Sequence, residues 1–181
     1  MLGTILFLGV AGDASPLRRT KHDSLVALEL IVNWEKWGWD LSAIAAAATE
    51  DGGGTMLHEA VTHGHTEALE ALVAAGASLE ARMDEYSTAG VRFTLTPLHM
   101  AAAKGKVEPI RALIAAGANL EAISSHYELT PLHMAARRGH ASAISALTAA
   151  GASLSARNIE KSSPPLCMVC HLWSRPPPPA L

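Results

Sequence analysis

A motif that recurs three times along the chain most limits what this sequence can fold into. Thr-Met-Leu-His begins at Thr55, and Thr-Pro-Leu-His begins at Thr96 and again at Thr130. In each copy a glycine follows nine residues after the threonine, a leucine or isoleucine fourteen residues after it, and a Gly-Ala pair twenty-one residues after it. The copies start 41 and 34 residues apart. A repeat of this period predicts a stack of similar units, each of which buries its apolar face against its neighbours.

Each copy has the residues of two short helices joined by a tight turn. Threonine is a favoured N-cap, and proline fits the first helical position because the N–H group that it lacks would have no partner there. An alanine-rich sequence follows, and the glycine then ends the first helix. The second helix has apolar residues at i, i+3 and i+4, as at Leu69, Leu72 and Val73, which makes one buried stripe. The chain is therefore predicted to be all-α.

These features resemble the ankyrin repeat, which shares the Thr-Pro-Leu-His start, the alanine-rich first helix, the Gly-His or Gly-Lys pair and the closing Gly-Ala pair. The resemblance implies an ankyrin-repeat solenoid of helix-turn-helix units joined by hairpin loops, with about 33 residues in each unit. The spacing of 41 residues departs from that length, and the extra residues between Arg82 and Leu95 are expected to form a longer hairpin loop. Thr94 and Glu128 stand where glycine usually turns the hairpin, so irregular hairpin tips are expected.

Less similar copies extend the repeat in both directions. A degenerate copy starts at Ser15, and a further start at Pro164 is not completed. Terminal repeats are expected to be atypical because one of their faces meets solvent. A tryptophan cluster at the end of the degenerate copy, Trp34, Trp37 and Trp39, either covers the open end of the stack or anchors a partner. The expected segments are an apolar leader or cap at 1–14, a degenerate ankyrin-like repeat and loop at 15–54, ankyrin repeats at 55–95, 96–129 and 130–157, and an aborted repeat with a Pro-rich tail at 158–181.

Charge and hydropathy argue against two classes of partner. The formal net charge is −3, whereas nucleic-acid binding needs a clustered basic surface. The apolar run from Met1 to Ala11 is shorter than the ~20 residues that span a bilayer, and it lacks the preceding Lys or Arg of a signal peptide. We interpret this run as a leading helix that caps the core, with a signal peptide and export as the alternative. A cytoplasmic, monomeric protein without nucleic-acid or membrane partners is expected.

No group of residues has the spacing of a catalytic site, so an enzyme is not expected. His58 and His63 are five residues apart, whereas the zinc-protease helix motif needs histidines at i and i+4. His58, His99 and His133 recur at equal positions of units that stack ~10 Å apart, so they cannot share one metal ion. The ankyrin resemblance implies that these three histidines make structural hydrogen bonds to the backbone.

The run Cys167-Met168-Val169-Cys170-His171 matches the attachment pattern of c-type haem. It supplies the alternative function, a haem- or metal-binding protein. Haem attachment needs an oxidising compartment, and the sequence has no clear export signal. A zinc site at these residues lacks a clear fourth ligand. We therefore expect no cofactor.

The ankyrin resemblance also implies where a partner would bind, because partners of this family contact the hairpin tips and the exposed residues of the first helix. By position, the first-helix residues are Thr62, His63, Ala103, Lys104, Arg137 and Arg138, and the tip residues are Arg92, Phe93, His126 and Tyr127. Four of these would form a locally basic concave strip, namely His63, Lys104, Arg137 and Arg138. We therefore predict a non-catalytic protein-protein interaction module, a scaffold or adaptor. Its partner is expected to have an acidic surface and an apolar contact for Phe93 or Tyr127.

Overall fold

The computed structural model describes residues 42, 45, 54–86, 92–125 and 127–156. The predicted segments at 1–14 and 158–181, most of the one at 15–54, the tryptophan cluster, and Cys167, Cys170 and His171 lie outside these residues. Within the described part, no helix is long and apolar enough to cross a membrane. The elements are the helices α4 (Met56–His63), α5 (Thr66–Ala74), α6 (Pro97–Lys104), α7 (Val107–Ala115), α8 (Pro131–Arg138) and α9 (Ala141–Ala149), and the strands β1 (Met83–Tyr86) and β2 (Arg92–Leu95).

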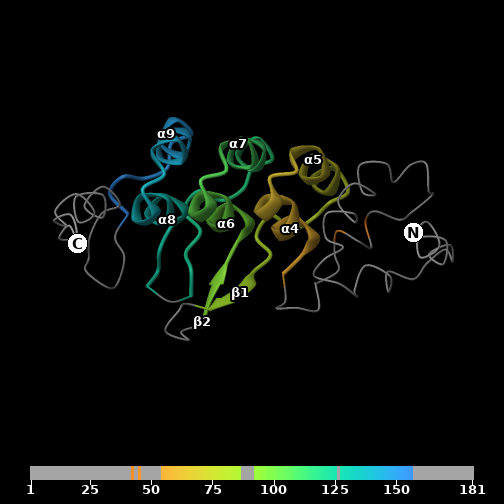
Figure 1. The fold of residues 1–181 in the computed structure, drawn as a ribbon, viewed down its shortest axis with the longest axis horizontal. Helices are drawn as coiled ribbons and strands as arrows, with labels where there is room; N and C mark the ends of the chain where they lie inside the picture. Colours follow the sequence, from red (N-terminus) through yellow and green to blue (C-terminus); the bar gives the residue numbers. More distant parts are fainter. Residues whose placement is uncertain (1–41, 43–44, 46–53, 87–91, 126, 157–181) are drawn as a thin grey trace, which may run out of the picture.

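The six described helices form two parallel rows. An inner row contains α4, α6 and α8, and an outer row contains α5, α7 and α9 (Figure 1). Each inner helix packs against the outer helix that follows it in the chain, and α6 also packs between α4 and α8. The hairpin of β1 and β2 extends on the side away from the outer row. The predicted stack of helix-turn-helix units joined by hairpins is therefore confirmed.

The inner helices begin where the sequence predicts. Thr96 and Thr130 have extended backbones at the N-cap, and their hydroxyl oxygens accept hydrogen bonds from the backbone N–H groups of His99 and His133, at 3.5 and 3.4 Å. The histidine ring returns the bond, because Nδ1 of His133 accepts from the backbone N–H of Thr130 at 3.2 Å. This reciprocal cap uses a histidine in the place where a glutamate is more common.

The apolar stripe of each unit forms one continuous core. Leu57, Leu98 and Leu132 occupy the same position in successive inner helices, and each is about 1% exposed. In the outer row the predicted residues Leu69 and Leu72 are fully buried, whereas Val73 is half-buried. The equivalent outer residues Ile110, Leu113 and Leu147 are also fully buried. Burying each such side chain stabilises the fold by about 2 kcal/mol, and this burial holds neighbouring units together.

The two hairpins differ from each other. In the first, the expected long loop contains an antiparallel ladder that pairs Met83 with Leu95 and Asp84 with Thr94, so Thr94 lies in regular strand. In the second, Tyr127 and Glu128 have positive φ angles of 72° and 50°. Such angles are uncommon in residues other than glycine, and Glu128 is the position where glycine was expected. The predicted irregularity is thus found in the second hairpin.

The inner helices end at Gly64, Gly105 and Gly139, whose φ angles lie between 67° and 79°. Gly105 has a second constraint, because a Cβ atom there would lie 2.7 Å from the ring of His140. A Cβ atom at Gly139 would meet nothing within 4 Å. We expect Gly139→Ala to lower the free energy of unfolding by about 1 kcal/mol, and Gly105→Ala by about 3 kcal/mol. Urea unfolding followed by circular dichroism measures both losses.

The same measurement on the double variant Gly105→Ala, His140→Ala separates the two constraints at Gly105. Removal of the ring leaves only the strain of the left-handed backbone. The double variant should therefore lose less than the sum of its two single changes. Equal losses in Gly105→Ala and Gly139→Ala would contradict the contact between His140 and Gly105.

Candidate functional site

Basic side chains end each inner helix of the described part. His63, Lys104 and Arg138 are the last residues of α4, α6 and α8, each directly before the glycine that ends the helix, and all three are exposed. Because α4, α6 and α8 pack side by side, these residues lie in a row with ~10 Å between neighbours. Arg137 is also exposed and adds a second charge beside Arg138. We call these four residues the basic row.

The cations of the basic row have a structural use at the end of a helix. The carbonyl end of an α-helix carries a partial negative charge, which a Lys, Arg or protonated His in the last turn stabilises by about 0.5 kcal/mol. That interaction leaves most of their hydrogen-bonding capacity open to a partner. His63 lies 3.5 Å from the carboxylate of Glu59. Among the described residues, Lys104, Arg137 and Arg138 form no ion pair.

The predicted hairpin residues lie at the other end of the inner helices. Arg92 and Phe93 are in β2, which leads into α6, and Tyr127 shortly precedes α8. The residues of the basic row lie at the C-terminal ends of the inner helices. An inner helix of eight residues is ~12 Å long, so a partner that touches both groups must cover the exposed side of the inner helices.

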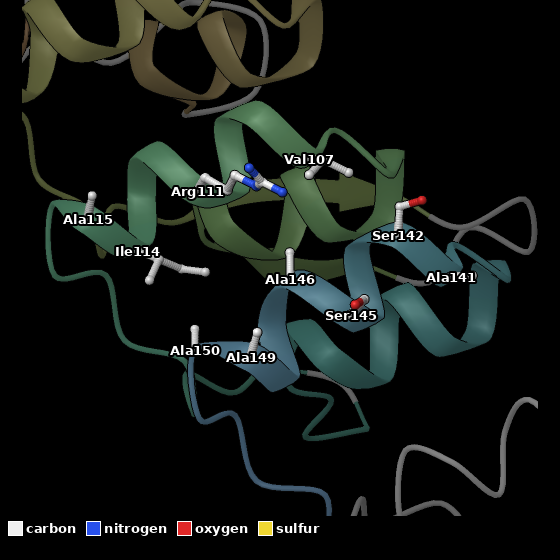
Figure 2. A pocket seen from close by; sticks show the side chains of 10 residues that line it. All are labelled: Val107, Arg111, Ile114, Ala115, Ala141, Ser142, Ser145, Ala146, Ala149 and Ala150. Atoms are coloured by element: carbon white, nitrogen blue, oxygen red, sulfur yellow. The ribbon is translucent and has the colours of Figure 1, made fainter.

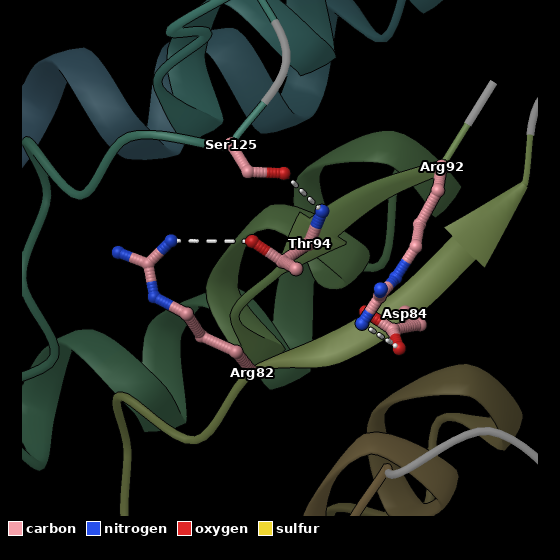
Figure 3. Close-up of polar contacts among 5 residues, drawn as sticks. All are labelled: Arg82, Asp84, Arg92, Thr94 and Ser125. Carbon is pink, nitrogen blue, oxygen red and sulfur yellow. Dashed lines mark hydrogen bonds and ion pairs between the residues drawn. The ribbon is translucent and has the colours of Figure 1, made fainter.

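An ion pair and a hydrogen bond brace the first hairpin internally, and two further hydrogen bonds join it to the second; Figure 3 draws these contacts except the one to Ile123. Nη2 of Arg92 lies 2.6 Å from the Asp84 carboxylate, across the strand pair. Arg82 donates to the hydroxyl of Thr94 at 3.3 Å and to the carbonyl of Ile123 at 3.1 Å. The backbone N–H of Thr94 donates to the Ser125 hydroxyl at 2.9 Å. Arg92 is therefore already paired, and the hairpin is held in place for a partner.

The other predicted contacts have different surroundings. Thr62 and Ala103 are half-buried beside the basic row. Tyr127 is half-buried and packs against the core, so only part of its ring is open to a partner. The side chain of Phe93 and the whole of His126 lie outside the described residues.

Two basic residues beside the row were missed in the sequence. Lys106 folds back over the preceding unit, so that its Nζ lies 3.5 Å from where a Cβ of Gly64 would be. His140 folds back in the same way over Gly105, and its Nε2 lies 3.1 Å from the Ala103 carbonyl oxygen. Both follow directly after the glycine that ends an inner helix, and that position is the sequence signal that could have identified them.

The buried histidines are structural, as predicted. Nε2 of His58 and of His99 lies 3.2 and 2.9 Å from the carbonyl oxygens of Leu95 and Leu129, each in the loop that leads into the next inner helix. Burial of His58 and His99, which desolvates the charged ring, lowers the pKa of each to about 4. Hydrogen bonds to the backbone carbonyls partly oppose this shift. Within the described part, no group of three or more His, Cys, Asp or Glu side chains is arranged to hold a metal ion.

A groove of about 770 Å³ runs between the outer helices α7 and α9 (Figure 2). Alanine and serine from α9 line one side, and Val107 and Ile114 from α7 line the other. Arg111 is the one ionisable side chain among its lining residues. The lining residues include the hydroxyls of Ser142 and Ser145 but no His, Asp, Glu or Lys that could act as a base to activate them.

The chain was compared with known proteins. The family model for ankyrin repeats, in three copies, matches residues 57–158, which is more than half of the chain. The matched region contains α5 to α9 and all of α4 except its first residue, Met56. No curated protein matches the chain.

Proposed function

Because the chain belongs to the ankyrin repeat family, we propose that it is a non-catalytic scaffold or adaptor that binds a partner protein through the basic row and the adjoining face of the inner helices. Ankyrin repeats generally act as protein-protein interaction modules. Stacking gives such a module its surface, because each unit adds equivalent exposed positions to one continuous face.

The charge of the basic row carries the proposal. Lys104, Arg137 and Arg138 are exposed cations on neighbouring helices, and none of them forms an ion pair among the described residues. Cations without partners on one face create a local positive potential, although the net charge of the chain is −3. That potential favours a partner with an acidic surface and speeds its association.

The hairpins supply a second contact area for the same partner. Arg92 and Tyr127 precede the inner helices whose last residues form the basic row, so the ~12 Å length of an inner helix separates the two groups along the helix direction. A partner that fills the distance between them would cover far more surface than the row alone. Stable protein interfaces bury about 800 Å² on each side, which a row of four side chains cannot provide.

Affinity capture followed by mass spectrometry tests the proposal. The baits are the native chain and the variant Lys104→Glu, Arg137→Glu, Arg138→Glu, which should remain helical by circular dichroism because all three side chains are exposed. We expect partners of the native chain to be lost from the variant, since like charges that face each other across an interface cost several kcal/mol.

A matched control distinguishes this site from general charge repulsion. Arg111→Glu makes the same charge change on the outer helix α7, at an exposed residue without an ion pair in the described part. We expect Lys104→Glu alone to reduce capture by roughly tenfold and Arg111→Glu to leave it unchanged. Equal capture by the native chain and the triple variant would rule out the basic row as the binding site.

A further inference from the structure

The two side chains that fold back over the preceding unit turn the basic row into a ladder of paired basic side chains. Lys106 lies beside Gly64, which follows His63, and the ring of His140 lies beside Gly105, which follows Lys104. At Gly139 the pair comes from Arg137 and Arg138 of the same helix. Each of the three turns between an inner and an outer helix thus carries at least two basic side chains, and His65 adds a third at the first turn, where its ring centroid lies 6.3 Å from that of His63. We call this set the turn ridge: His63, Lys104, Lys106, Arg137, Arg138 and His140.

Acidic side chains face the turn ridge mainly at its first two turns. Glu59 pairs with His63, and Glu67 and Glu108 are exposed in the first turns of α5 and α7. The equivalent position in α9 is Ser142, and the first turn of that helix contains no acidic residue. The ridge therefore becomes more positive from α4 towards α8, and its attraction for an anion is strongest at α6 and α8.

The spacing of the turns limits the shape of the partner. Neighbouring inner helices pack ~10 Å apart. An extended chain rises ~3.3 Å per residue, so three of its residues match one step of the ridge. A polyproline II helix rises ~3.1 Å per residue and has three residues per turn, so its residues i and i+3 also point to the same side. An α-helix would need six or seven residues for the same distance, since it rises ~1.5 Å per residue.

We infer that the turn ridge binds an extended acidic segment of a protein, in which Asp or Glu recurs at every third residue and each acid faces one pair of basic side chains. This inference rests on the proposed function and adds the form of the partner. A single strand of nucleic acid is the competing anion. The acidic residues Glu59, Glu67 and Glu108 beside the ridge disfavour it, because a continuous row of phosphates would pass close to all three.

Peptide binding measured by fluorescence anisotropy tests the inference on the full chain. The probe is a labelled peptide of Glu-Pro-Ala repeated three times, and its control is an isomer of the same composition with the three glutamates adjacent. We expect the repeated peptide to bind roughly tenfold more tightly than the isomer. Lys106→Ala should weaken its binding severalfold although Lys106 is on no inner helix, and Arg111→Ala should not.

Each of the other outcomes contradicts a specific part of the inference or the proposed function. Equal binding of the two peptides would reject the three-residue spacing. If neither peptide binds while capture of a partner still depends on Lys104, the inference fails and the proposed function stands. Tighter binding of a single-stranded oligonucleotide than of the acidic peptide would show that the turn ridge binds nucleic acid and would reject the inference. If capture also fails to depend on Lys104, the proposed function itself is wrong.

Discussion

Replacement of His99 by leucine is expected to lower the free energy of unfolding by about 4 kcal/mol, the largest loss that we predict for a single substitution. The ring of His99 is fully buried and links two units. Its Nδ1 lies 2.8 Å from the Thr96 hydroxyl, and its Nε2 lies 2.9 Å from the carbonyl oxygen of Leu129. Leucine has a similar size and keeps the packing, but it removes all the hydrogen bonds of the ring. The backbone N–H of Thr96, which donates to Nδ1 at 3.4 Å, is left without an acceptor, and the Thr96 hydroxyl loses its ring partner. The Leu129 carbonyl loses one of its two hydrogen bonds and keeps the one from the backbone N–H of Ser124 at 3.0 Å. A lost hydrogen bond costs about 1 kcal/mol. Each buried polar group without a partner costs about 1–3 kcal/mol.

The control for His99→Leu is the same substitution at an exposed histidine. His63 ends α4 at the surface, and substitutions at such positions usually change stability by less than about 0.5 kcal/mol. Urea unfolding of both variants compares the two losses directly. A loss below about 1 kcal/mol in His99→Leu would mean that hydration of the unfolded chain offsets these bonds, and that apolar packing alone holds the units together.

The repeat was sufficient to predict most of the fold. Thr96 and Thr130 cap their helices and Gly105 ends one, because each of these roles depends on the local backbone and is visible in the sequence. The strand pair of the first hairpin was not predicted. Its residues, between Arg82 and Leu95, are an insertion without a counterpart in the other copies, so comparison of the copies gave no information about its register.

The candidate site was predictable only in part, because some of its contacts cross between units. Lys104 and Arg138 could be placed from their equal positions in two copies. Lys106 and His140 could not, since they reach the surface of the preceding unit by folding back over it. Tyr127 was expected as an exposed anchor, but it packs partly against the core beside a backbone of positive φ. Such an angle is rare for tyrosine and could not be expected from the sequence.

Acidification is expected to destabilise the described units through the buried histidines. The pKa of His58 and that of His99 are lowered from 6.5 to about 4, chiefly by desolvation of the buried ring, and the nearby charge of Arg82 lowers that of His99 further. Between these two values the unfolded chain binds more protons than the folded chain, so stability falls as the pH falls. The full contribution is present above pH 6.5 and is lost progressively towards pH 4. From pH 7.5 to 5 the loss should be about 2 kcal/mol for each histidine.

Urea unfolding at several pH values between 7.5 and 5 measures this loss, in a range where ordinary carboxylates remain ionised. The variant His99→Leu tests the assignment, because it removes one of the two titrating rings. Its stability should start lower at pH 7.5 but fall about 2 kcal/mol less by pH 5 than that of the native chain. The two curves would then converge as the pH falls. Parallel curves would instead show that the proton uptake belongs to other groups, and that the pKa of His99 is the same in the folded and the unfolded chain.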